Sequence, residues 1–172
     1  MTATAPILVF MGPAGTGKST VAGMLAGRLG WDFQEGDDLH PAVNVAKMAA
    51  GHALNDDDRW PWLDRVAAWI DGEIAAGRPG VITCSALRRS YRDVLRRDGV
   101  TFVLLMGDPK LVLDRLLRRQ GHFMPPALLS SQFETLEIPD ADEQAIQIDL
   151  DLTPGEQVQE VIDRLQLTHS PS

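Results

Sequence analysis

Short, continuous apolar runs alternate along the chain with longer segments whose apolar residues recur every three or four positions. Continuous runs are typical of strands buried on both faces of a parallel sheet, whereas the longer segments have the period of amphipathic helices. The runs predict strands over residues 6–11, 31–34, 80–84, 101–106 and 145–150. The longer segments predict helices over residues 18–29, 42–50, 57–76, 88–97, 109–120, 126–136 and 154–166.

This alternation predicts an α/β fold of three layers, in which a parallel sheet has helices on both faces. No internal repeat or long linker interrupts the pattern, so residues 1–172 are expected to form a single domain. Ligands of such folds bind at the carboxyl ends of the strands. We therefore expect the chemistry in the loops that follow residues 11, 34, 84 and 106.

The charge distribution limits the possible partners. The formal net charge of −8 argues against nucleic acid as the main partner, because a phosphate backbone needs a broad basic face. Nine of the sixteen lysines and arginines nevertheless lie between Arg88 and Arg119. Solvated arginines on two amphipathic helices explain several of these, but an acidic chain with a basic middle favours a small anionic ligand.

Cys84 is the single cysteine, which excludes an internal disulfide framework and suits a reducing cytosol. The opening segment MTATAPILVFMG lacks a basic region, and its apolar run is too short for a signal peptide or a membrane span. We therefore expect a soluble cytoplasmic protein without a membrane partner, in which Cys84 has a structural role.

The first predicted strand leads into GPAGTGKST, which completes the pattern G-x-x-x-x-G-K-[ST]. A chance glycine-rich turn is the alternative, but a strand before and a helix after are the context that a phosphate-binding loop requires. In such loops backbone N–H groups cradle phosphates, and we expect Lys18 at the β/γ-phosphates and the Ser19 hydroxyl on Mg²⁺. The predicted ATP-binding residues of the loop are Gly12, Pro13, Ala14, Gly15, Thr16, Gly17, Lys18, Ser19 and Thr20.

Several classes of protein bind ATP in this way. The chain is too short for a motor ATPase, lacks the NKxD reader of GTPases, and has no strand ending in the acidic pair of a water-activating ATPase. It resembles instead the small kinases of the nucleoside monophosphate and shikimate kinase group. A non-catalytic nucleotide sensor remains open, and it would bind ATP without turnover.

Two further features carry that resemblance. Glu35 and Asp37, in QEGDD, place two carboxylates in the loop after the second strand, where one could hold water on Mg²⁺ and the other accept a proton from an attacking hydroxyl. Arg115 and Arg119 precede a breaker-rich segment and resemble the arginines that flank a mobile lid, here residues 119–130, one lying on the adenine and one reaching the transferred phosphate. Ordinary loop and surface-helix charges are the alternative for both features.

A more specific resemblance covers nearly the whole chain. Residues 36–63, GDDLHPAVNVAKMAAGHALNDDDRWPWL, closely resemble the gluconokinase pattern G-D-x-L-H-P-x-x-N-x-x-K-M-x-x-G-x-P-L-x-D-x-D-R-x-P-W-L. CSALRRSYRDVLR, RQGHFMP and SQFETLEIPDADE follow in the order of that family. The chain departs from the family at Ala53, where proline is usual, and at Glu35, where aspartate is usual.

The resemblance to gluconokinases implies a P-loop kinase fold with a five-stranded parallel sheet in the order 2-3-1-4-5 and a substrate-binding insert over residues 36–63. It also implies a homodimer that uses ATP and Mg²⁺ to phosphorylate D-gluconate at the 6-hydroxyl, feeding the pentose phosphate or Entner–Doudoroff routes. A shikimate-like or nucleoside monophosphate kinase is the alternative within the class. Shikimate kinases, however, usually have a Gly-Gly-Gly turn where this chain has CSALRR.

The expected chemistry assigns roles to individual residues. Asp37 orients and deprotonates the hydroxyl, while Lys18 and Arg119 gather positive charge around the transferring phosphoryl group. Arg59 and Arg88 are expected to bind the carboxylate or the polyol, because arginine grips a carboxylate with two hydrogen bonds. The secondary substrate candidates are His40, Asn44, Lys47 and His122, of which Lys47 and His40 fit a helix-capping role equally well. The metal candidates are Ser19 and Glu35.

The stretch NDDDRWPWLD, residues 55–64, has the aspartates and asparagine of a helix start. Asp56 is expected to do no more than begin that helix. Arg59 would leave the helix N-terminus beside the acceptor loop, so we expect the helix start to aim Arg59 at the substrate. Trp60 or Trp62 could pack on the substrate as well.

Overall fold

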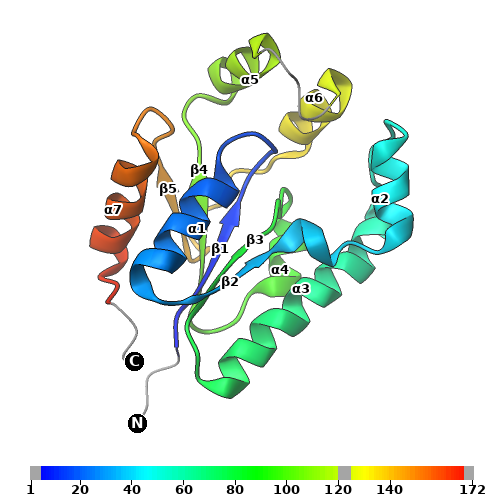
Figure 1. Cartoon of the computed structure of the whole chain (residues 1–172). Helices are drawn as coiled ribbons and strands as arrows, with labels where there is room; N and C mark the ends of the chain where they lie inside the picture. Colours follow the sequence, from blue (N-terminus) through cyan, green and yellow to red (C-terminus); the bar gives the residue numbers. More distant parts are fainter. Residues whose placement is uncertain (1–4, 120–124, 169–172) are drawn as a thin grey trace.

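The computed structural model describes residues 5–119 and 125–168, in which five parallel strands form one sheet with helices on both faces (Figure 1). The strands are β1 (Ile7–Met11), β2 (Asp32–Glu35), β3 (Gly80–Thr83), β4 (Val100–Leu105) and β5 (Ala145–Ile148). Their order across the sheet is β2-β3-β1-β4-β5. The predicted three-layer α/β fold with this strand order is therefore confirmed.

Strand β1 lies in the middle of the sheet and pairs with β3 and β4, so that Ile7 is opposite both Gly80 and Val100. Every residue of these three strands is buried, which explains why their sequences are continuous apolar runs. Strand β2 forms one edge of the sheet and is partly exposed, and its sequence is correspondingly more polar.

Each predicted helix is present, with ends that lie within two residues of the expected ones. The helices are α1 (Lys18–Leu29), α2 (Ala42–Ala49), α3 (Asp56–Ala76), α4 (Arg89–Leu95), α5 (Pro109–Arg118), α6 (Pro126–Thr135) and α7 (Pro154–Leu165). The predicted helix 88–97 is shorter than expected because both Arg88 and Arg96 have an extended backbone. None of the described helices is long and apolar enough to cross a membrane.

The two faces of the sheet carry separate hydrophobic clusters. Leu8 and Phe10 point to one face and join apolar residues of α1 and α7. Ile7, Val9 and Met11 point to the other face, where they join residues of α3 and α4. Helices α5 and α6 lie beyond the carboxyl edge of the sheet (Figure 1). This edge is where the sequence places the phosphate-binding loop.

A single 3-10 turn, η1 (Gly36–Leu39), follows β2 and was not predicted. Position 36 has to be glycine, because a Cβ atom there would lie 1.8 Å from the carbonyl oxygen of Thr83. The close approach lets the chain turn directly beside β3. It thereby places Asp37 at the carboxyl edge of the sheet.

Candidate active site

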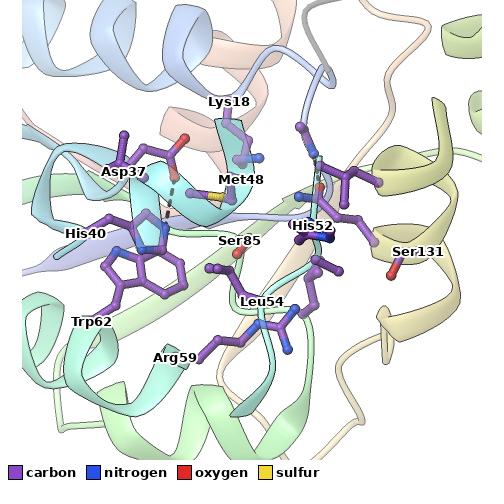
Figure 2. A pocket seen from close by; sticks show the side chains of 16 residues that line it. Lys18, Asp37, His40, Met48, His52, Leu54, Arg59, Trp62, Ser85 and Ser131 are labelled. Atoms are coloured by element: carbon purple, nitrogen blue, oxygen red, sulfur yellow. Dashed lines mark hydrogen bonds and ion pairs between the residues drawn. The ribbon is translucent and has the colours of Figure 1, made fainter. Parts of the chain in front are cut away.

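Two cavities meet at the carboxyl edge of the sheet. The P-loop cavity, of about 650 Å³, lies along loop residues 14–20 and reaches Glu35 and Arg119. The side cavity, of about 280 Å³, lies among residues of the P-loop, α2, α3 and α6 (Figure 2). Four residues line both cavities, namely Ala14, Lys18, Asp37 and Ser85. A group held in one cavity can therefore meet a group held in the other at Lys18 and Asp37.

The P-loop, residues 12–20, turns at three of its glycines. Gly12, Gly15 and Gly17 have φ angles of 123°, 84° and 93°, in the left-handed region that residues with a side chain rarely adopt. Gly17 is the N-cap residue of α1, so the N-terminus of this helix lies at the loop. Tightly turned backbone N–H groups at a helix N-terminus form a site for phosphate oxygens.

Lys18 is the cation at the junction of the two cavities. Its Nζ donates hydrogen bonds to the carbonyl oxygens of Gly12, at 2.8 Å, and Pro13, at 2.9 Å. Burial lowers the pKa of Lys18, and the nearby Asp37 carboxylate acts in the opposite direction. The neighbouring Cys84 is buried, which raises the pKa of its thiol to about 12 and keeps it protonated. This agrees with a structural role for Cys84.

The two metal candidates lie together at the P-loop cavity. Ser19 Oγ donates to Glu35 Oε2 at 2.9 Å, and Thr83 Oγ1 donates to the same oxygen at 2.8 Å. Thr83 Oγ1 in turn accepts from the backbone N–H of Gly36, which fixes its orientation. Hydroxyl and carboxylate oxygens suit Mg²⁺. The described residues hold no cluster of three His, Cys, Asp or Glu that could bind a metal. Phosphate and water oxygens would therefore have to complete the shell.

Asp37 projects into both cavities, with a side chain that is 83% exposed. His40 lies behind it, and Nε2 of its ring is 4.0 Å from Asp37 Oδ1. The imidazole stacks on Trp62, with ring centroids 4.1 Å apart. Asn44 Nδ2 is 3.2 Å from His40 Nδ1 and donates to the carbonyl oxygen of Asp58 at 2.8 Å.

This geometry determines the proton position on His40. A carbonyl oxygen only accepts hydrogen bonds, so the Asn44 atom that faces Asp58 is the amide nitrogen, which also donates to Nδ1 of His40. The proton of the neutral ring is therefore on Nε2, the atom nearest to Asp37. Burial lowers the pKa of His40 and keeps the ring neutral, although the Asp37 carboxylate opposes this.

Arg59 is held at the side cavity by Tyr91 and Asp56. Its Nη1 donates to the Tyr91 hydroxyl at 2.9 Å and lies 3.6 Å from Asp56 Oδ1, while its Cζ lies 5.3 Å from the centre of the Tyr91 ring. The Tyr91 hydroxyl donates to Asp56. The expectation that Asp56 only begins a helix is therefore too narrow, because its carboxylate also anchors the Tyr91–Arg59 pair.

The predicted substrate residues have different locations. Asp37, His40 and Arg59 line the side cavity; Figure 2 shows Asp37 with Lys18 at one end and Arg59 towards the other. Lys47 does not line it, and its Nζ is 2.6 Å from Asp58 Oδ2 in the capping box of α3. Arg88 is exposed at the N-cap of α4 and does not line it either. His122 lies outside the described residues.

Further polar residues of the side cavity were not predicted from the sequence, namely His52, Ser85, Ser131 and Gln132. Gln132 also reaches the P-loop, since its Oε1 accepts from the backbone N–H of Ala14 at 2.7 Å. All four lie in segments that carry the resemblance to gluconokinases: His52 in residues 36–63, Ser85 in CSALRR, and Ser131 and Gln132 in SQFETLE. That similarity was the available signal, but it did not distinguish these positions from their neighbours.

A buried ion pair supports the wall that contains Ser85. Arg92 and Glu143 are 1% and 4% exposed and form two hydrogen bonds, of 2.6 and 3.1 Å. Arg92 Nη1 also donates to the carbonyl oxygen of Ala86 at 2.8 Å. Ala86 has a φ of 44°, which is unfavourable for a residue with a side chain, so the Arg92 contact helps to hold this turn.

Arg115 and Arg119 line a third cavity of about 240 Å³, next to the P-loop. Its wall includes the apolar residues Val112, Leu116, Leu150 and Leu152. Arg119 also lines the P-loop cavity, whereas Arg115 Nη2 lies 3.2 Å from Asp151. The structure thus places both arginines at the loop. Of the predicted lid, residues 120–124 lie outside the described residues.

Comparisons with known proteins show which family the chain belongs to. The sequence profile of the shikimate kinase family matches residues 14–165. A gluconokinase of Gluconobacter oxydans (strain 621H) is 50% identical over 161 residues, which are 92% of this chain and 90% of that protein.

Two solved structures are similar over almost the whole chain. A gluconokinase from Sinorhizobium meliloti 1021 has a TM-score of 0.81 and 42% identity, covering 96% of this chain and 94% of its own. A sugar kinase from Janibacter sp. HTCC2649 has a TM-score of 0.84 and 42% identity, covering 94% of this chain and 95% of its own. With a phosphate loop, a carboxylate at the junction of two cavities and these relatives, the chain belongs to the gluconokinases, within the shikimate kinase family of P-loop kinases.

Proposed function

We propose that this kinase transfers the γ-phosphoryl group of ATP to the 6-hydroxyl of D-gluconate, giving 6-phosphogluconate and ADP. The observation that carries the proposal is the junction of the two cavities at Lys18 and Asp37, with Arg59 towards the far end of the side cavity (Figure 2). Gluconate has a carboxylate at one end and the reactive hydroxyl at the other. An extended acid bound to Arg59 would present its hydroxyl to Asp37. The gluconokinase relatives support this choice of acceptor.

On the nucleotide side, the P-loop N–H groups and Lys18 bind the phosphates, while Arg115 and Arg119 flank the adenine and the transferred phosphate. Kinases of this family use ATP with a divalent metal, which we propose to be Mg²⁺. Ser19 and Glu35 would hold it, Glu35 acting through water or directly, and the ion would neutralise charge on the phosphates. The shared hydrogen bond to Thr83 keeps Glu35 turned towards Ser19.

On the acceptor side, Arg59 binds the carboxylate and Asp37 accepts the hydroxyl proton. The 6-oxygen forms a bond to the γ-phosphorus, and the bond from that phosphorus to the β,γ-bridging oxygen breaks. The proton passes from the hydroxyl to Asp37 and then to water. Most of the acceleration comes from positioning and from the charges of Lys18 and Arg119, since phosphoryl transfer requires little other chemistry from a protein.

The apolar wall of the side cavity has a separate task. Trp62, Leu87 and Leu128 line it, and Trp62 also supports His40. Such walls exclude water, which strengthens the hydrogen bonds to the acceptor and limits hydrolysis of ATP. Closure of a lid over residues 119–130 would complete this exclusion. We place the reaction in the cytoplasm, which supplies the ATP, and expect a homodimer, which light scattering can test.

The decisive experiment is an ADP-release assay with ATP and Mg²⁺ across gluconate, shikimate, several sugars and nucleoside monophosphates. We expect gluconate to stimulate ADP release most strongly. Stimulation by shikimate or a monophosphate in its place would favour the alternatives within the class. Nucleotide binding without turnover on any acceptor would favour a non-catalytic sensor. Either result would contradict the proposal.

A further inference from the structure

Helix α6 contributes two polar side chains to the side cavity, although apolar residues anchor the helix in the core. Leu129 is 2% exposed within the cluster that covers one face of the sheet, and Phe133 packs against the same cluster. Ser131 and Gln132 lie on the cavity side of the helix, and Figure 2 shows Ser131 across the cavity from His40 and Trp62. The helix thus presents a fixed polar surface to any acceptor.

The two ends of the Gln132 amide have different environments. The Ala14 backbone N–H can only donate, so the amide atom that it contacts, at 2.7 Å, is the oxygen Oε1. The amide nitrogen Nε2 takes part in no hydrogen bond with any of the described residues. Gln132 therefore holds the P-loop with its oxygen, while both N–H groups of its nitrogen have no partner among the described residues.

We propose that Gln132 contacts the acceptor and links it to the P-loop. Its Nε2 donates a hydrogen bond to a hydroxyl oxygen of a polyhydroxy acid, and its Oε1 holds the N–H of Ala14. The inference rests on the proposed function, which supplies an acceptor with hydroxyl groups along its chain. In this proposal Arg59 and Asp37 bind the two ends of the acceptor, and Gln132 binds its middle.

The link has a thermodynamic consequence. An acceptor that binds Nε2 fixes the rotamer of Gln132 and thereby fixes Oε1 against Ala14, a residue that lines both cavities. The nucleotide then meets a loop that is already ordered, so its affinity rises when the acceptor is bound. By linkage, nucleotide binding raises the affinity for the acceptor by the same factor.

Two substitutions separate the two ends of the amide. Gln132→Glu keeps an oxygen for Ala14 but has no N–H for the acceptor. Gln132→Met keeps the length of the side chain, has neither contact and adds no charge. We expect both to raise the KM for gluconate about five- to fiftyfold, the range for losing a hydrogen bond in a cavity. Only Gln132→Met should also raise the KM for ATP.

The matched control is Glu134→Gln, an exposed position on the same helix that lines neither cavity, and it should leave both constants unchanged. A KM for gluconate that rises in Gln132→Glu alone would indicate charge repulsion and would overturn the inference. So would a KM for ATP that rises in Gln132→Met while the KM for gluconate stays unchanged, because Gln132 would then only anchor the loop.

The coupling is measured by titrating a non-hydrolysable ATP analogue with and without gluconate. We expect gluconate to tighten binding to the wild-type chain several-fold and to have no effect on Gln132→Met. Equal coupling in both proteins would overturn the link. The wild-type assay separates the two proposals. Absence of gluconate-dependent turnover overturns the proposed function together with this inference, whereas normal wild-type turnover with unchanged constants in both variants overturns the inference alone.

Discussion

The P-loop cavity and the side cavity adjoin each other but are built in different ways. The P-loop cavity depends on one continuous segment, in which glycines with positive φ turn the backbone and a helix begins at Gly17. The side cavity is assembled from side chains of the P-loop, η1, α2, α3, α6 and the turn after β3. A site formed by backbone groups depends little on which side chains surround it. A site formed by side chains changes when any one of them is replaced.

This difference teaches where specificity can reside. A backbone cradle recognises phosphate, which every nucleotide presents, so it does not distinguish acceptors. The side cavity instead contains a cation, Arg59, and a carboxylate, Asp37, to which the proposed function assigns the two ends of one acceptor. Changes in the side cavity that do not touch the P-loop should therefore alter acceptor kinetics and leave nucleotide binding intact.

The largest effect is expected at the junction of the cavities. Asp37→Asn keeps the shape of the side chain but removes its ability to accept a proton. We expect kcat with gluconate to fall about 10²- to 10⁴-fold, the usual contribution of general base catalysis. Titration with an ATP analogue should give an unchanged affinity. Turnover near the wild-type rate would contradict the role of Asp37 as base.

Next in size is the effect at the carboxylate-binding end of the side cavity. Arg59→Ala removes from the side cavity the positive charge that is proposed to bind the gluconate carboxylate, so we expect the KM for gluconate to rise about 10- to 100-fold. The KM for ATP should stay the same, and circular dichroism should show a folded chain.

Arg88→Ala is the matched control for Arg59→Ala, because Arg88 was predicted to bind substrate but is exposed and does not line the side cavity. We expect little change in this variant. An equal rise in KM for both would mean that Arg88 reaches the substrate, and the side cavity as described would then be incomplete.

A smaller effect is expected at Tyr91, which holds Arg59 without lining the cavity itself. Tyr91→Phe keeps the ring under the guanidinium and removes only the hydroxyl that joins Arg59 to Asp56. We expect the KM for gluconate to rise about three- to tenfold, less than for Arg59→Ala because the guanidinium stays in the cavity, with kcat nearly unchanged. If Tyr91→Phe raises the KM for gluconate by the same factor in the Arg59→Ala background as in the wild-type chain, Tyr91 does not act through Arg59.

The same contrast explains what could be predicted from the sequence. The elements and the turned backbone of the P-loop depend on local patterns, such as the glycine spacing between Gly12 and Gly17, and the structure confirms both. Asp37 and Arg59 could be identified because local signals accompany them, a strand end and a helix start respectively. Their roles stay predictions until the variants are measured.

Contacts between distant residues could not be predicted in this way. Gln132 lies 118 positions from Ala14, Thr83 lies 48 from Glu35, and Arg92 lies 51 from Glu143. Each of these pairs forms only because the sheet brings distant segments together. A local sequence pattern therefore cannot predict it. The predictions for Lys47 and Arg88 used their charge and their place in segments that resemble gluconokinases, whereas the fold pairs Lys47 with Asp58 and leaves Arg88 exposed.

The smallest expected effect concerns the pH dependence of stability. Burial lowers the pKa of His40 from its ordinary value of 6.5, helped by Arg59 and opposed by Asp37. Below pH 6.5 the unfolded chain therefore binds a proton at this position that the folded chain does not, so stability falls as the pH falls from 6.5 towards the lowered pKa. The loss is at most about 1.4 kcal/mol for each pH unit.

His40→Gln removes the titrating ring, so the variant lacks the loss of stability that the lowered pKa of His40 causes on acidification. The Tm of the wild type minus that of the variant should therefore decrease as the pH falls from about 7 to about 5. Differential scanning fluorimetry across this range gives that difference, and subtraction cancels the carboxylates that both proteins share. A difference that widens on acidification would mean that His40 is protonated more readily in the folded chain. The Asn44 hydrogen bond would then not keep its Nδ1 as an acceptor, and the Nε2 proton beside Asp37 would need another explanation.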